Sequence, residues 1–136
     1  MTRTYLIGQV APELVEIHDF VLCAQREGVL AVRPGVSGSS IDEVCRSIIA
    51  EAGYGPDFIH GTGHGVGLQI HEMPWVRSDF MELLQCGEVV TVEPGVYRVG
   101  VGGVRIEDLI LVTATSSQTL TLRQKESLCL PSRRMI

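Results

Sequence analysis

A glycine-rich segment that carries three of the four histidines has the residue types best suited to chemistry. Residues 60–71 read HGTGHGVGLQIH. Glycine lets a main chain turn or pack tightly where a Cβ atom would clash. Imidazole side chains held on such a backbone indicate a catalytic or metal site. The alternative interpretation is a glycine loop that bears a few surface histidines.

Two carboxylates interrupt apolar, β-branched stretches further along the chain. Glu93 follows the sequence VVTV, and Glu107 lies in VRIED beside Arg105. A carboxylate in a buried strand is costly unless it is paired or bound to metal. An ordinary ion pair between Arg105 and Glu107, which share one face of a strand, would explain that pair alone. With Glu93 and the histidines added, a metal site is the better account, and one histidine with two carboxylates suits Mn, Fe, Co or Zn.

Two helices are expected to precede these residues. The first spans residues 12–31, because proline suits the first helical position and apolar residues recur at helical spacing until a Pro-Gly pair turns the chain. The second spans residues 40–52 and begins at a capping box formed by Ser40 and Glu43. Both helices have one apolar face to bury.

Most of the remaining elements are expected to be strands. The predicted strands cover residues 2–8, 58–60, 89–97 with a break at Pro-Gly, 104–113 and 119–122. Helices followed by several strands are typical of an α+β fold, with the helices on one face of a mostly antiparallel sheet.

Composition excludes several classes of function. The chain has 136 residues, 45% of them hydrophobic, which suits a single domain with an aliphatic core. A net charge of -5 with no basic stripe argues against nucleic acid as a partner. No apolar run or signal peptide suggests a membrane or secretion, so a cytoplasmic protein is expected. The cysteines are widely spaced and are expected to be reduced thiols, and they suggest no zinc or redox motif: Cys23, Cys45, Cys86 and Cys129.

Three motifs in order resemble the C-terminal part of the pita-bread metallopeptidases, which are the Xaa-Pro dipeptidases, Xaa-Pro aminopeptidases and methionine aminopeptidases. They are HGTGHGVGLQIHE at 60–72, VTVEPGVY at 90–97 and GVRIED at 103–108. The Arg-x-Glu-Asp ending favours the Xaa-Pro branch. The resemblance covers residues 1–125, leaving 126–136 as a tail. It implies a partial pita-bread fold, in which two helices pack on a mostly antiparallel, curved sheet within one truncated domain of residues 1–136.

The resemblance also implies roles for individual residues. His64, Glu93 and Glu107 would bind divalent metal such as Mn, Co or Zn, with Glu107 bridging the two ions that the family uses. His60 and His71 would line the site for an Xaa-Pro peptide substrate, and His71 would polarise the scissile carbonyl. Arg105 would orient Glu107 and shape the mouth of the pocket. No further cofactor is implied.

The chain departs from the family at its start. The family also uses two aspartates on a β-hairpin, the second in an Asp-x-Thr-Arg-Thr segment, whereas this chain begins Met-Thr-Arg-Thr. We therefore expect at most one weakly bound ion and little or no peptidase activity from the chain alone. His18 matches no motif and is expected at the surface.

The same departure bears on partners and on other functions. Uncovered sheet edges and apolar surface lead us to expect a homodimer or higher oligomer. Two alternatives to a peptidase are a non-catalytic peptide- or protein-binding module that reuses the fold, and a fragment of a creatinase-like hydrolase.

Overall fold

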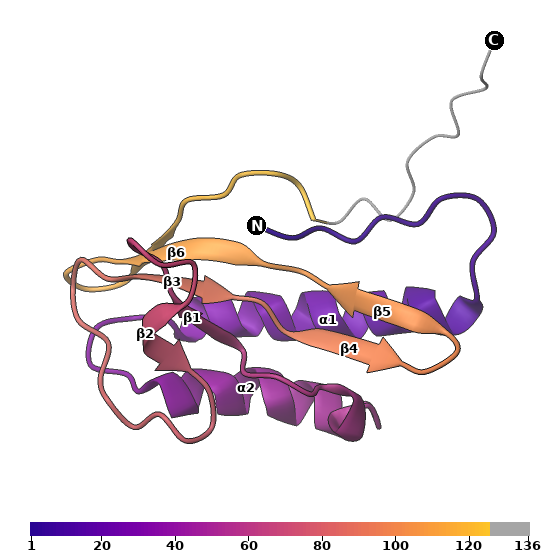
Figure 1. Cartoon of the computed structure of the whole chain (residues 1–136), viewed down its shortest axis with the longest axis horizontal. Coiled ribbons are helices and arrows are strands. Elements are labelled where there is room, and N and C mark those ends of the chain that lie inside the picture. The colour runs from indigo at the N-terminus through magenta and orange to yellow at the C-terminus, as the bar shows by residue number, and fades with distance from the viewer. Residues whose placement is uncertain (126–136) are drawn as a thin grey trace, which may run out of the picture.

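Two helices, α1 (Pro12–Ala31) and α2 (Gly38–Glu51), pack together on one face of a mostly antiparallel sheet (Figure 1). The computed structural model describes residues 1–125, so the predicted tail at 126–136 lies outside the described residues. The α+β arrangement is the one that the sequence predicts, and the bounds of α1 agree with the prediction.

Five strands form the main sheet in the order β2-β1-β3-β6-β7, and two more form a separate hairpin, β4-β5. All of these pairings are antiparallel. The hairpin extends from the end of the main sheet along α1 (Figure 1). The strand bounds are β1 Gly63–Gly65, β2 Glu72–Val76, β3 Val89–Val92, β4 Gly95–Arg98, β5 Gly102–Arg105, β6 Asp108–Val112 and β7 Ser117–Thr119.

The start of α2 differs from the prediction. Its N-cap is Ser37, whose backbone is extended and whose side chain accepts a hydrogen bond from the Ser40 backbone N–H at 3.2 Å. The predicted capping box at Ser40 and Glu43 is therefore wrong. The first helical residue is Gly38, where close packing against β2 leaves no room for a side chain: a Cβ atom would stand 2.0 Å from the Trp75 carbonyl oxygen. The helix therefore begins one turn earlier than predicted, at the earlier of two possible serine caps.

Several predicted strands are shorter than expected or absent. Residues 2–8 form no regular strand, although Thr2 pairs with Glu107 in an isolated antiparallel bridge. Residues 58–60 are also not a strand, because a short 3₁₀ turn at Gly55–Asp57 precedes them and β1 begins only at Gly63. The last strand, β7, lies slightly earlier than the predicted residues 119–122.

The two strands that carry the candidate carboxylates are each divided. The predicted strand 89–97 becomes β3 and β4, with Glu93 and Pro94 between them. The predicted strand 104–113 becomes β5 and β6, with Ile106 and Glu107 between them. Proline cannot donate to a ladder, which favours the first break. Both glutamates therefore sit where the chain leaves the main sheet for the β4-β5 hairpin.

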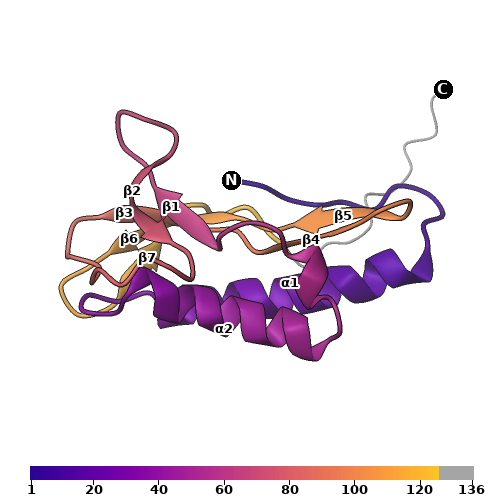
Figure 2. The same ribbon diagram turned by 60° about the horizontal axis from the view of Figure 1, so that its bottom comes forward.

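Strand alternation divides the side chains of β3 and β6 between two environments. Val90 and Ile110 are fully buried in the core beneath the helices. Thr91 and Leu109, which are paired across the strands, project to the opposite face. Figure 2 shows that the loop between β1 and β2 and the N-terminal segment lie on this face, away from the helices. The candidate site is built on the same face.

His18 is buried, so its predicted surface position is wrong. Only 1% of it is exposed, because α1 packs against α2 and also against the β4-β5 hairpin. The buried part of the helix is therefore broader than the apolar stripe and includes Gln25. Within residues 1–125, no helix is long and apolar enough to cross a membrane.

Candidate metal and catalytic site

A pocket of about 360 Å³ opens on the face of the sheet away from the helices. Its walls bring together five of the six residues predicted from the sequence: His64, His71, Glu93, Arg105 and Glu107. These side chains come from β1, the β1-β2 loop, the end of β3, the end of β5 and the β5-β6 connection. The sixth, His60, lies outside the pocket wall and reaches it through a neighbouring side chain.

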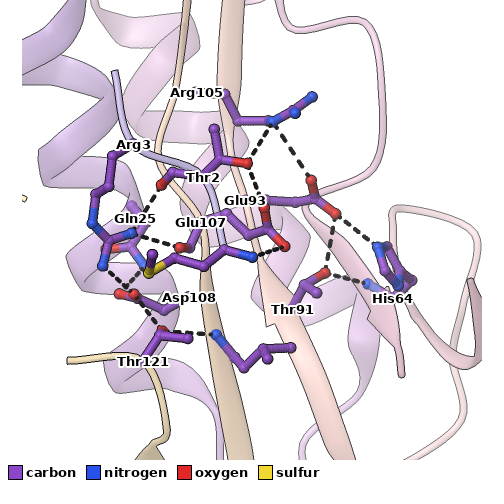
Figure 3. A network of polar contacts seen from close by, with 12 residues as sticks. Thr2, Arg3, Gln25, His64, Thr91, Glu93, Arg105, Glu107, Asp108 and Thr121 are labelled. Atoms are coloured by element: carbon purple, nitrogen blue, oxygen red, sulfur yellow. Dashed lines mark hydrogen bonds and ion pairs between the residues drawn. The ribbon is translucent and has the colours of Figure 1, made fainter. Parts of the chain in front are cut away.

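His64 and Glu93 both line the pocket and are in direct contact (Figure 3). His64 Nε2 lies 3.0 Å from Glu93 Oε1, and both residues are largely shielded from solvent. The other ring nitrogen, Nδ1, lies 2.9 Å from the Gly65 carbonyl oxygen. A proton on Nδ1 donated to this carbonyl leaves Nε2 as the atom directed at the carboxylate. The structure therefore orients the imidazole as a metal ligand requires.

Thr91 joins the histidine and the glutamate. Its hydroxyl accepts from the His64 backbone N–H at 3.0 Å and donates to Glu93 Oε1 at 3.0 Å (Figure 3). The approach of β1 to β3 requires a glycine at position 63, where a Cβ atom would lie 1.9 Å from the Thr91 carbonyl oxygen. The glycines of the histidine segment thus have a packing role that explains their presence.

Glu107 shares the pocket but is held by other partners. Its carboxylate accepts a hydrogen bond from the Thr2 hydroxyl and lies 3.2 Å from the Met1 ammonium group. Within residues 1–125, no three or more His, Cys, Asp or Glu side chains converge closely enough to hold a metal ion. The predicted set of His64, Glu93 and Glu107 is therefore brought into one pocket, but only the first two are in contact.

Arg105 faces Glu93 rather than Glu107. Its Nε atom lies 3.8 Å from Glu93 Oε2, and its guanidinium donates to the Tyr97 hydroxyl at 3.4 Å. Burial would lower the pKa of Arg105, but Tyr97 and the two glutamates outweigh it and raise that pKa. No ion pair between Arg105 and Glu107 appears among the described residues, so the alternative of an ordinary ion pair between them is not found here. The register of the β4-β5 hairpin directs the guanidinium toward the end of β3 instead.

Tyr97 is a residue that sequence reasoning missed. Its hydroxyl lies 3.0 Å from His60 Nε2 and also meets Arg105, so it connects the predicted sixth residue to the pocket. The available signal was its position four residues after Glu93 on the same predicted strand. His60 is therefore placed beside the pocket and not in its wall.

His71 stands at the end of the β1-β2 loop, against His64. The two rings meet edge to face with their centroids 4.3 Å apart. His71 is exposed, unlike His64. Its loop is braced by Glu72, whose carboxylate accepts from the Gln69 backbone N–H at 3.0 Å. His71 can thus reach a molecule in the pocket while its ring stays in contact with the candidate ligand.

Asp108 belongs to the third sequence motif, but no role was predicted for it. It is fully buried and accepts hydrogen bonds from Arg3 at 2.6 Å, Gln25 at 3.0 Å and Thr121 at 2.7 Å (Figure 3). Burial would raise the pKa of Asp108, but hydrogen bonds from Lys125, Thr121 and Arg3 lower it below its ordinary value. This cluster fixes the chain directly beside Glu107 on the helix side of the sheet.

The donor types in the pocket suit a divalent cation, although the three described candidate ligands do not converge on one point. An imidazole nitrogen and a carboxylate oxygen already face each other, and a second carboxylate lines the same pocket. Nitrogen and oxygen donors of this kind suit borderline metals such as Mn, Co and Zn. An antiparallel sheet backed by two helices thus presents, on its open face, donor types that metal-dependent hydrolases use.

Comparison with known proteins gives the family. Residues 1–114 match the model of the family described as "Metallopeptidase family M24". The chain belongs to this family. An Xaa-Pro dipeptidase of Pyrococcus horikoshii is 44% identical over 126 residues, which are 93% of this chain and 36% of that protein. An uncharacterized peptidase of Staphylococcus saprophyticus is 47% identical over 125 residues, covering 92% of this chain and 36% of the relative.

Solved structures agree with the predicted fold. The prolidase from Pyrococcus horikoshii superimposes with a TM-score of 0.89 at 44% identity, covering 91% of this chain and 36% of that one. An X-Pro aminopeptidase from Thermotoga maritima gives a TM-score of 0.89 at 36% identity, covering 94% of this chain and 36% of that one. The prediction of a partial pita-bread fold is confirmed. The chain spans about a third of the length of these relatives.

Proposed function

We propose that this chain carries the metal-binding part of an Xaa-Pro peptidase site, with His64, Glu93 and Glu107 as ligands to one weakly bound divalent ion. The observation that carries the proposal is the 3.0 Å contact between His64 Nε2 and Glu93 Oε1 in a pocket that Glu107 also lines. Membership of a metallopeptidase family and the likeness to an Xaa-Pro dipeptidase support it.

The ion would supply Lewis-acid chemistry and activate water toward a peptide bond. The protein's own side chains have the remaining roles. His71, exposed beside His64, can donate a hydrogen bond to the scissile carbonyl oxygen as negative charge develops there. Arg105 keeps a positive charge at the pocket edge, facing Glu93, and Tyr97 holds its guanidinium in place. His60 adds a second contact to the same tyrosine.

We propose that hydrolysis by this chain alone is weak or absent. The Glu107 carboxylate accepts a hydrogen bond from the Thr2 hydroxyl, so the ion would have to displace or share this contact to gain its third protein ligand. Fewer protein ligands leave more coordination positions to water and lower the affinity.

Calorimetric titration with Mn²⁺ or Co²⁺ tests the proposal. We expect one weak site in the natural chain and loss of binding in His64→Ala and Glu93→Gln. His71→Ala is the matched control, because it removes a second histidine from the same pocket without removing a proposed ligand, and should bind the ion as the natural chain does. Equal affinity in His64→Ala would refute the ligand assignment. Turnover of an Xaa-Pro dipeptide at the rate of a full-length relative would refute the expected weakness.

A non-catalytic peptide-binding module is the second candidate. It is favoured by one observation, the absence of a converged group of three metal ligands among residues 1–125. The two functions give different results in the presence of a chelator. Binding of a proline-containing peptide that persists in EDTA would favour the module, whereas binding that needs the ion would favour the peptidase site.

A further inference from the structure

We propose that Asp42, on α2 behind the sheet, is a positioning residue for the candidate metal site and acts through Thr62. This inference deepens the proposed function and rests on it only for the consequence for metal affinity. Asp42 is fully buried, although carboxylates are seldom buried without a specific partner. No sequence motif predicted a role for it.

Among the described residues, Asp42 accepts hydrogen bonds from Thr62, in the histidine segment, and from Arg46 on its own helix. Oδ1 accepts from the Thr62 backbone N–H and from the Thr62 hydroxyl, both at 2.9 Å. Arg46, one helical turn later, donates from Nε to Oδ2 at 2.8 Å and from a terminal nitrogen to Oδ1 at 3.1 Å. The carboxylate is thus well satisfied, which a buried charge requires.

Thr62 transmits this anchor to the site. It is fully buried and lies between His60 and His64 in the sequence. Its carbonyl oxygen accepts a hydrogen bond of 2.7 Å from the Glu93 backbone N–H. Asp42 therefore binds the backbone N–H of Thr62, while the carbonyl of the same residue binds Glu93, a proposed metal ligand. The other proposed ligand of the contacting pair, His64, follows two residues later on the same backbone.

Arg46 extends the anchor to the other side of His60. Its guanidinium donates to the Phe58 carbonyl at 3.0 Å and to the His60 carbonyl at 2.9 Å, and it lies 4.3 Å from the Phe58 ring centre. The segment between the 3₁₀ turn and β1 belongs to no strand, and these side chains supply part of its hydrogen bonding. The pair on α2 consequently fixes where His60, His64 and Glu93 lie relative to one another.

A purely structural role would make the same contacts without affecting site geometry, so the test must observe that geometry directly. The readouts in the ¹⁵N-labelled full chain at fixed pH are the Glu93 amide shift, its hydrogen-exchange protection and the His64 imidazole ¹⁵N shifts. Melting temperature is recorded in parallel, and Co²⁺ affinity is measured by titration.

Asp42→Asn should lower the exchange protection of the Glu93 amide about tenfold, move the His64 imidazole shifts and weaken Co²⁺ binding by about 10- to 100-fold, as loss of outer-shell support does in other metal sites. Glu43→Gln is the matched control, because Glu43 is the exposed neighbouring carboxylate and bonds only Ser47 among the described residues. It should leave the Glu93 exchange protection, the His64 imidazole shifts and the Co²⁺ affinity unchanged.

Thr62 variants keep the proposal testable if Asp42→Asn fails to fold. Thr62→Val keeps the side-chain shape and removes the hydroxyl bond to Asp42, so it should shift the Glu93 amide and the His64 ring. Thr62→Ser restores the hydroxyl and should return both signals toward those of the natural chain. Folded Asp42→Asn or Thr62→Val with unchanged Glu93 and His64 signals would overturn the proposal.

Failure of the proposed function gives a different result. If the natural chain binds no Co²⁺ but Asp42→Asn still moves the Glu93 and His64 signals, Asp42 is a positioning residue in a site that does not bind metal. If the natural chain binds Co²⁺ and Asp42→Asn leaves the affinity and both signals unaltered, the metal assignment stands and the positioning role is refuted.

Discussion

His18 combines burial with unmet hydrogen-bonding capacity. It is 1% exposed, and neither ring nitrogen has a hydrogen-bond partner among the described residues. Burial lowers the pKa of His18 from its ordinary value, and the neighbouring charge of Asp19 opposes this only in part. The folded state therefore holds the imidazole neutral at a pH where the unfolded chain would protonate it.

This difference predicts how stability depends on pH. As pH falls below about 6.5, the unfolded chain binds a proton at His18 that the folded chain does not, so the free energy of unfolding decreases until the lowered folded pKa is reached. His18→Leu should remove this part of the loss and add about 1–3 kcal/mol at neutral pH by eliminating unpaired buried polar atoms. Urea unfolding between pH 5 and pH 8 checks both effects. An unchanged pH slope in His18→Leu would contradict the explanation.

The site shows what residue types can and cannot indicate. Histidine and glutamate spacing identified the pocket, because these residues are costly or unusual on apolar and glycine-rich backbone. The partner of Arg105 and the contribution of Tyr97 depend on the register between β4 and β5. That register is set by tertiary packing, which no local pattern contains.

Some helix and strand bounds follow from local sequence signals, and others depend on tertiary packing. The α1 bounds follow from local signals, a proline at the start and a Pro-Gly turn after the end. The breaks around Glu93 and Glu107 arise because β4-β5 leaves the main sheet, and β-branched runs look alike on either side of such a departure. β2 was missed because it contains Pro74, which is tolerated there because β2 is an edge strand.

The cap of α2 gives a prediction at this scale. Ser37→Ala removes the acceptor for the Ser40 backbone N–H and should destabilise the chain by about 1 kcal/mol. Ser40→Ala is the matched control and should cost less, because within residues 1–125 the Ser40 hydroxyl bonds only the Ser37 hydroxyl. Denaturant unfolding of the two variants compares them. A larger loss in Ser40→Ala would restore the capping box as the better description.

At the scale of the whole molecule, apolar side chains remain in water near the pocket. Leu68, Ile70 and Met73 are at least 64% exposed, and they lie on or beside the β1-β2 loop that projects from the sheet (Figure 2). The adjoining strand β2 is an edge strand with unpaired backbone groups. Exposed apolar surface beside an open edge favours association.

We therefore expect a homodimer or higher oligomer, measured by light scattering across a dilution series. Leu68→Ser should shift the equilibrium toward monomer, since Leu68 is fully exposed and its replacement costs no packing within the chain. Leu120→Ser, a partly exposed leucine outside the loop, serves as the comparison and should associate as the natural chain does. A monomer at every concentration would contradict this expectation.

The cluster around Asp108 has a consequence for the order of folding. Arg3 reaches it across 105 positions of sequence, whereas Thr121 and Lys125 reach it across 13 and 17. Closing the longer loop costs more entropy before any contact rewards it. We therefore expect the C-terminal side of the cluster to assemble with the β6-β7 hairpin and the N-terminal segment to join later. Because Thr2 and Arg3 also hold Glu107, the pocket becomes complete only at this later step.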